Sequence, residues 1–174
     1  MTERPADFLA PFWRRLDAAP VVDTVAAADL PAGFRALLDH TAGMTGTLAD
    51  HWGVPLRVRR LAQWEEDRRL ARLVALESGA VTAAIAAIRV ELDALPASVH
   101  AGMVGSTAPF GRLLDEAGVR HRAEPLAFLR ADADAALAGV AGVAAGAVLW
   151  GRYGSLLGED GRVLCRALEL LPRA

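Results

Sequence analysis

The segment Leu70-Ala71-Arg72-Leu73-Val74-Ala75-Leu76-Glu77 decides the fold class, because it is apolar and alternates in the manner of a β-strand. Successive side chains of a strand point to opposite faces, so the even-numbered residues from Leu70 to Leu76 form one apolar face that contains Arg72. An arginine is rarely buried unless it is paired, and its planar guanidinium matches a carboxylate. The segment therefore predicts a bound anion or an internal acid beside Arg72. The alternatives are an edge residue that reaches water, or a structural ion pair.

This segment is also one arm of the strongest hairpin candidate in the chain. Apolar runs at 68–77 and 80–91 flank the turn signal Glu77-Ser78-Gly79. The second run is so rich in alanine that a helix is equally natural by propensity. Its β-branched residues and the preceding turn favour a strand, so a hairpin is the prediction.

Glycine and proline divide the rest of the chain into further helices and strands. Helices are expected at 6–18 and 31–40, in a short segment ending near Gly53, twice within 96–118, and within 132–146. Strands are expected at 56–61 and 119–130, and a second hairpin at 147–157 and 162–171 around Gly158-Glu159-Asp160-Gly161. This pattern predicts a single α+β domain over residues 1–174.

Composition narrows the functional class. The chain has 174 residues, 53% of them hydrophobic, which is enough for one well-packed core. Its net charge of −2 and pI near 6.1 argue against a nucleic-acid-binding surface. All 19 basic residues are arginine and none is lysine. This bias is typical of GC-rich codon usage, so the number of arginines does not indicate a function.

Cysteine, histidine and hydropathy patterns exclude further classes. The single Cys165 excludes an internal disulfide and a cysteine-based zinc site. The four histidines lie on separate segments without metal-ligand spacing, so no metal is predicted. The N-terminus carries Glu3 and Asp7 in a broken apolar run, unlike a signal peptide, and no window reaches the roughly 18 apolar residues of a membrane span. The expected location is the cytoplasm.

Several short motifs, taken in order, point to a family: Gly43-Met44-Thr45, Arg72 opening an apolar strand, Pro109-Phe110-Gly111-Arg112, and Leu149-Trp150-Gly151-Arg152 before a hairpin ending in Glu169 and Pro172. Over about residues 36–172, their order and spacing resemble the chorismate pyruvate-lyases, small enzymes that make 4-hydroxybenzoate for ubiquinone biosynthesis. The resemblance implies a single antiparallel sheet of about six strands with helices on one face. It also implies two helix-turn-helix flaps, at 41–54 and 97–117, over a buried ligand.

The resemblance further implies roles for four residues. Met44 would line the pocket beneath the first flap, and Arg72 would bind the ring carboxylate. The backbone of Phe110, where the family has a leucine, would meet the ligand at the second flap. Glu169 would contact the ring hydroxyl near the scissile bond. Arg72 and Glu169 are thus the expected catalytic residues, and all four are expected to bind substrate without a cofactor.

The implied reaction is the elimination of pyruvate from chorismate, or from a related carboxylated ring. Aromatisation drives this reaction, so the protein needs mainly to orient the substrate and stabilise charge. Counting from the Leu149–Arg152 motif, however, places the glutamate of the family on Leu168 and Glu169 one position later. A one-residue slip reverses the face of a strand, and a bulge or a longer turn would restore the register.

Two other functional classes fit the same resemblance. One is a relative with changed chemistry in specialised metabolism, or a non-catalytic protein that binds a small carboxylate. The other is a small-molecule sensor, because a similar fold serves as the effector-binding half of some transcription regulators. Against the sensor, residues 1–35 are too short and insufficiently basic for a DNA-binding module. The expected partner is a small carboxylate rather than nucleic acid or a membrane, and no oligomeric state is predicted.

Overall fold

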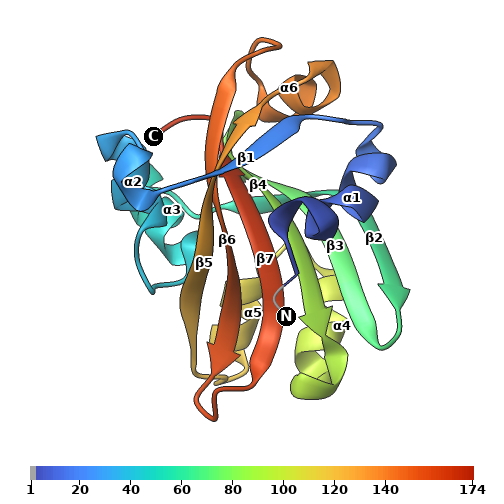
Figure 1. Cartoon of the computed structure of the whole chain (residues 1–174). Coiled ribbons are helices and arrows are strands. Elements are labelled where there is room, and N and C mark those ends of the chain that lie inside the picture. Colours follow the sequence, from blue (N-terminus) through green and yellow to red (C-terminus); the bar gives the residue numbers. More distant parts are fainter. Residues whose placement is uncertain (1–2) are drawn as a thin grey trace.

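A computed structural model describes residues 3–174, and in this range the strands form one seven-stranded antiparallel sheet, which confirms the predicted α+β class (Figure 1). The strands are β1 (Val21–Val25), β2 (Arg57–Glu66), β3 (Arg69–Ser78), β4 (Val81–Glu91), β5 (His121–Asp132), β6 (Val148–Gly158) and β7 (Val163–Leu171). The helices are α1 (Pro5–Leu16), α2 (Ala32–Leu38), α3 (Met44–Trp52), α4 (Ala97–Gly105), α5 (Phe110–Glu116) and α6 (Ala135–Ala141), with 3₁₀ turns η1 (Ala27–Asp29) and η2 (Leu92–Ala94). No helix within residues 3–174 is both long and apolar enough to cross a membrane.

The sheet consists of two three-stranded meanders joined in the middle, with β1 added at the β5 edge. Its strand order is β1-β5-β6-β7-β4-β3-β2, so β2–β3–β4 and β5–β6–β7 are each built from consecutive strands. Both predicted hairpins are present, as β3–β4 and β6–β7, with Gly79 and Gly161 in the left-handed conformation at their turns. The alanine-rich run is the strand β4, because it lies between β3 and β7 and is buried on both faces.

Edge strand β1 was not predicted from the sequence. Its five residues show no regular apolar alternation, and Val21 is 61% exposed. The strand exists because it pairs with β5, from Val21 opposite Asp132 to Val25 opposite Phe128. The observed sheet therefore has one strand more than the six expected.

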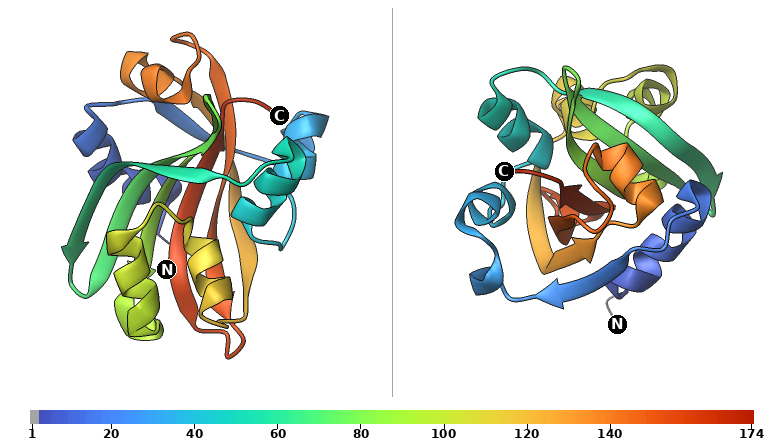
Figure 2. Two further views of the ribbon diagram at one scale, coloured as in Figure 1. Left: turned by 180° about the vertical axis from the view of Figure 1, so that it is seen from behind. Right: turned by 90° about the horizontal axis from the view of Figure 1, so that it is seen from above.

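Helices cover both faces of the sheet, whereas helices on one face were predicted. In Figure 2, α2 to α5 lie on one side, and the sheet curls toward α1 and α6 on the other. Both faces need cover because β3 is apolar on both: Leu73 belongs to the core beneath α1, and Leu70 to the core beneath α4 and α5. The resemblance therefore implied one helical layer where the structure has two.

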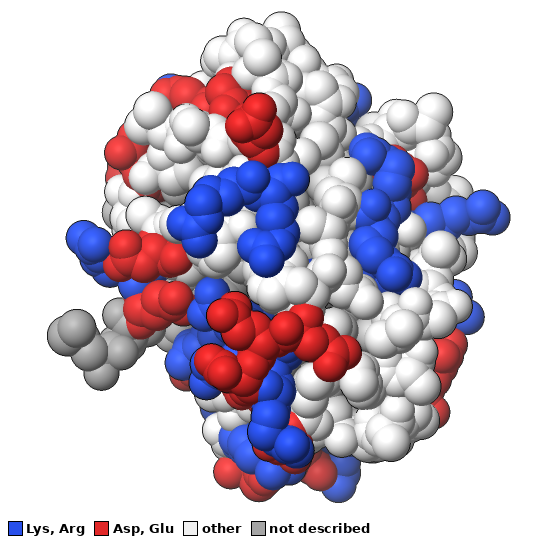
Figure 3. Space-filling model, turned by 90° about the vertical axis from the view of Figure 1, so that its right-hand side faces the viewer, with Lys and Arg blue, Asp and Glu red and all other residues white. Residues whose placement is uncertain are grey.

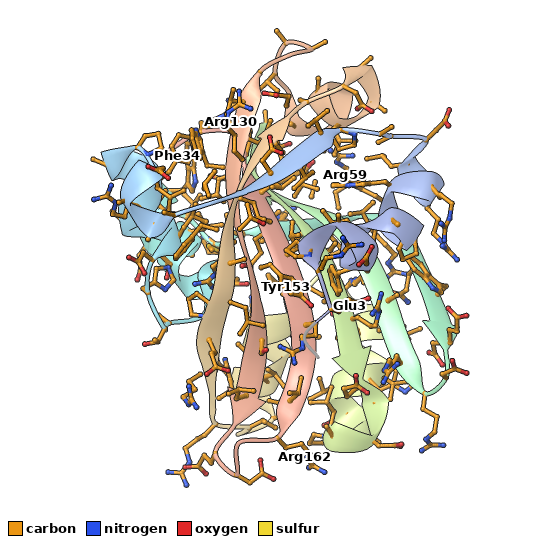
Figure 4. All side chains as sticks on the ribbon, in the orientation of Figure 1. Glu3, Phe34, Arg59, Arg130, Tyr153 and Arg162 are labelled. Carbon is orange, nitrogen blue, oxygen red and sulfur yellow. The ribbon has the colours of Figure 1, made fainter. Side chains whose placement is uncertain are left out.

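Aromatic side chains form the core beneath α1. Figure 4 shows Tyr153 of β6 in this region, and its ring centroid lies 5.1 Å from that of Phe8. The Phe12 ring lies 5.1 Å from the Trp64 ring on β2. Helix α1 thus connects the centre of the sheet with its β2 edge, and this core lies on the opposite face from α2 to α5.

Surface charges are mixed rather than separated by sign. Figure 3 shows arginines beside acidic side chains on the side of the molecule that carries the β2 edge. Arg68 pairs with Asp93, and Arg69 with Glu91 at 2.9 Å. Such exposed pairs contribute only about 0–1 kcal/mol each to stability. This side of the molecule therefore presents no field of a single sign.

Gly154 allows β6 to approach β5 where the register shifts between Pro125 and Ala127. A Cβ atom at this position would lie 2.6 Å from the Glu124 carbonyl oxygen, well inside van der Waals contact. We expect Gly154→Ala to lower the free energy of unfolding by about 1–3 kcal/mol, measured as a lower urea midpoint.

Gly139→Ala in α6 is the control for this substitution. Within the described residues no atom would lie within 4 Å of the added Cβ outside the helix backbone and the chain neighbours. We expect it to be neutral or to stabilise the protein by about 0.5–1 kcal/mol. Equal urea midpoints for Gly154→Ala and the unmodified protein would contradict the predicted clash.

Candidate functional site

A cavity of about 490 Å³ lies between the sheet and the helices α3 and α5. This volume is in the usual range for small-molecule sites, which is about 300–1,000 Å³. Strands β3 to β7 form the floor, and the apolar lining includes Leu56, Val58, Val74, Leu76, Ile88 and Leu156. The four residues expected to contact a ligand, Met44, Arg72, Phe110 and Glu169, all line this one cavity.

Two helical segments form the roof, at the positions predicted for the flaps. Met44 begins α3 and Phe110 begins α5, and both side chains are buried. The first segment is attached to the sheet by a hydrogen bond from the Ala123 amide to the Thr41 carbonyl, at 2.9 Å. The second is attached by a bond from the Val58 amide to the Thr107 carbonyl, at 3.1 Å. Both segments therefore lie on the cavity side of the sheet.

Arg72 is a buried cation with no acidic partner among the residues that the structure describes. Its side chain lines the cavity, and the residue is 1% exposed. Its Nη2 donates a long hydrogen bond of 3.4 Å to the Ser106 carbonyl, and its Nε has no partner among the described residues. Burial, and to a lesser degree the charge of Arg60, lower the pKa of Arg72 to about 10, so the guanidinium stays charged at neutral pH.

This environment decides among the alternatives for Arg72. A residue that is 1% exposed does not reach water, and within residues 3–174 no carboxylate lies at ion-pair distance from its guanidinium. The internal acid, the structural ion pair and the exposed edge position therefore do not apply. A bound anion is the alternative that would supply the missing partner.

Glu169, and not Leu168, faces the cavity. Leu168 belongs to the core beneath α1, on the opposite face of β7. The pairing of β6 with β7 shifts between Leu156, opposite Cys165, and Leu157, opposite Val163. This irregularity leaves one extra residue in β7, so the bulge considered from the sequence is present. In the resulting register Glu169 pairs with Arg152 across the strands.

Arg152 also lines the cavity, and no role for it was predicted from the sequence. Its Nε lies 2.9 Å from a carboxylate oxygen of Glu169, and both side chains are largely buried, 5% and 14% exposed. Its other nitrogens donate to the carbonyls of Leu38 at 3.3 Å, His40 at 3.1 Å and Ala42 at 3.5 Å. Arg152 thus holds the chain that leads into α3. The available signal was the same as for Arg72, a single arginine within an apolar strand.

Two further side chains complete the wall. His121 lines the cavity, and its Nδ1 donates a 2.9 Å hydrogen bond to the Val119 carbonyl. Cys165 is fully buried, and burial raises the pKa of its thiol to about 12. Cys165 is therefore a neutral, apolar part of the wall at physiological pH, and not an activated nucleophile.

Comparison with known proteins finds solved structures with a similar fold but no match by sequence. No family model matches the sequence, and no curated protein matches it. Among solved structures, the chain is similar to the effector domain of PhnF from Mycobacterium smegmatis, with a TM-score of 0.57 and 13% identity over 75% of this chain and 88% of that one. It is also similar to the ligand-binding domain of a protein assigned to the GntR family of transcriptional regulators from Bordetella bronchiseptica, with a TM-score of 0.50 and 17% identity over 67% and 85%.

A structure that includes more of PhnF gives a similar result, with a TM-score of 0.56 and 13% identity. The match covers 76% of this chain and 64% of that one, so the chain spans just under two thirds of the longer protein. At such low identity these likenesses show a shared fold.

The prediction of a carbon–oxygen lyase is wrong. One similar structure is an effector domain, the other is the ligand-binding domain of a protein assigned to the GntR family of transcriptional regulators, and neither is named as a lyase. The geometry accords with this correction, because Glu169, the expected acid, is ion-paired with Arg152. The motifs that resembled the lyases mark features of the fold and of its cavity, which one fold can use for different functions.

Proposed function

We propose that this chain is a non-catalytic ligand-binding domain of the effector type, and that its ligand is a small carboxylate with an apolar body. The observation that carries this proposal is Arg72, a buried cation in an otherwise largely apolar cavity, whose Nε has no partner within residues 3–174. A buried charged group without partners costs free energy, and a carboxylate could accept two parallel hydrogen bonds from the guanidinium.

The composition of the wall supports an apolar body for the ligand. Met44 and Phe110 approach from the roof, and Val74 and Ile88 from the floor. These side chains offer contact area but no charge. A ligand that fills the cavity would bury its apolar part against them and present its carboxylate to Arg72.

The similar structures support the binding of an effector rather than the catalysis of a reaction. One is an effector domain, and the other is the ligand-binding domain of a protein assigned to a family of transcriptional regulators. In this chain, residues 5–25 form α1 and β1 of the sheet domain, so they do not supply a DNA-binding helix pair. The proposal therefore concerns the sensing part of such a system.

Arg72 also offers a route by which a ligand would affect the roof. Its Nη2 contacts the Ser106 carbonyl in the linker between α4 and α5. A ligand carboxylate would compete with this carbonyl for the same guanidinium. Occupancy of the cavity would thus be coupled to the position of the second flap.

Thermal stability in the presence of matched ligand pairs tests the proposal. We expect benzoate, phenylacetate and octanoate to raise the melting temperature, and their neutral amides to have little effect, because only the carboxylates can pair with Arg72. At a ligand concentration of about 100 times the Kd, the stabilisation should be about 2.7 kcal/mol. Equal stabilisation by acids and amides, or none by any acid, would refute the function proposed here.

A further inference from the structure

We propose that Glu169 determines the charge selectivity of the cavity, so that the site accepts monoanionic carboxylates and rejects dianions such as dicarboxylates and phosphate monoesters. This inference rests on the proposed function and specifies its ligand class. It follows from the unequal pairing of the two buried arginines, Arg72 and Arg152, that line one cavity.

The buried charges of the cavity leave one positive charge unneutralised. Arg72 has no acidic partner among the described residues, whereas Arg152 is paired with Glu169 at 2.9 Å. Two arginines and one glutamate thus give a buried sum of +1, which a single carboxylate would neutralise. The other charged residues of the lining are exposed: Asp50, Arg112, Asp115 and Glu124. Three of these four are acidic, so the rim adds no attraction for a second negative charge.

The geometry makes Arg152 unavailable to a ligand. Its Nε donates to Glu169, and its terminal nitrogens donate to the Leu38, His40 and Ala42 carbonyls. A second ligand carboxylate near Arg152 would therefore have to displace Glu169 or lie beside it. Two carboxylates side by side in a water-poor site repel each other strongly.

Glu169 is positioned for this role by the strand register. It shares the cavity face of β7 with Cys165 and Ala167, and the β6–β7 register places it directly opposite Arg152. Arg72 lies on β3, separated from β7 by β4. The free and the neutralised arginine thus lie in different parts of one floor, and Glu169 removes one of two potential anchors for a ligand with a negative charge at each end.

The test compares octanoate with octanedioate, which share a chain length and differ by one carboxylate. We expect calorimetry at neutral pH and fixed ionic strength to show that the unmodified protein binds octanoate at least roughly tenfold more tightly, because like charges in a buried site cost several kcal/mol. Glu169→Gln keeps the shape but removes the charge, so it frees Arg152. The preference should fall by at least roughly tenfold or reverse in this variant.

Two variants act as controls. Glu124→Gln removes a negative charge from the exposed rim, and it should change the preference by less than about threefold because solvent screens that charge. Glu169→Asp keeps the charge and should retain the preference for octanoate. If Glu169→Gln does not fold, equal binding of octanoate and octanedioate by the unmodified protein and by Glu169→Asp would still overturn the inference.

The possible failures are distinguishable. Equal binding of octanoate and octanedioate by the unmodified protein, or an unchanged preference in a folded Glu169→Gln protein, would overturn the selectivity role of Glu169. Either result would leave Arg72-dependent carboxylate binding, and thus the proposed function, intact. Failure of every carboxylate to bind would overturn the proposed function and this inference together.

Discussion

Replacing Arg72 with methionine is expected to make the free protein more stable while it weakens carboxylate binding. The guanidinium is buried with an unpartnered Nε and one long hydrogen bond, so the folded protein bears much of its desolvation cost. Methionine is unbranched and apolar like the aliphatic part of arginine, and it has no charge to desolvate. We expect the free energy of unfolding to rise by about 1–3 kcal/mol, or roughly 2–12 °C in melting temperature.

The same substitution removes the proposed anchor of the ligand. A charged hydrogen bond contributes about 1.5–3 kcal/mol, so the Kd for benzoate or octanoate should rise roughly 10- to 150-fold, measured by calorimetry. Arg69→Met, on the same strand but with an exposed side chain, is the control and should change stability by less than about 0.5 kcal/mol. A clear loss of stability in Arg72→Met would show that the guanidinium has a structural role in the free protein.

A loss of stability, opposite to the gain expected for Arg72→Met, is expected on replacing Arg152, the other buried arginine of the cavity. Arg152→Ala would leave the largely buried Glu169 carboxylate uncompensated and remove the donor for three carbonyls in front of α3. Breaking a buried pair from one side costs about 3–5 kcal/mol, or roughly 6–20 °C in melting temperature for a chain of this size. Chemical denaturation would measure the free energy of unfolding, and calorimetry would measure the melting temperature.

A double variant separates the two contributions of Arg152. Arg152→Ala with Glu169→Gln removes the uncompensated charge, so part of the lost stability should return, with a coupling energy of about 0.5–3 kcal/mol. The unsatisfied carbonyls of Leu38, His40 and Ala42 would account for the remainder. Strictly additive losses would show that the Arg152–Glu169 pair is not an energetic unit.

Local sequence patterns were sufficient for much of the fold and for Arg72, whereas the family resemblance was needed to place Met44, Phe110 and Glu169 at the cavity. The period-2 alternation around Arg72 and the turn at Gly79 identified the central hairpin, because both signals lie within neighbouring residues. The face of Glu169 could not be predicted with certainty, because it depends on an irregular pairing between β6 and β7. β1 and the cover of the second face arise from partners far along the chain, which no short window contains.

The role of Arg152 lay outside sequence reasoning for the same reason. Its partners at Leu38 and His40 are more than one hundred residues away, and they are backbone carbonyls that no residue type specifies. The function was harder to predict from the sequence than the fold or the cavity. An arginine and flaps over a cavity are equally compatible with turnover or with reversible binding of a carboxylate. The resemblance therefore pointed to a lyase, where the similar structures are an effector domain and a ligand-binding domain.

The division of the sheet into two meanders has a consequence for the order of folding. Each meander pairs strands that are neighbours in the chain, whereas the β4–β7 pairing, with Ile85 opposite Leu170, must close a long loop. Such long-range pairing is entropically costly, so it comes after the local hairpins. Arg72 belongs to the first meander, and Arg152 and Glu169 to the second. The cavity therefore exists only once the meanders have joined, and a bound carboxylate will slow unfolding without accelerating folding.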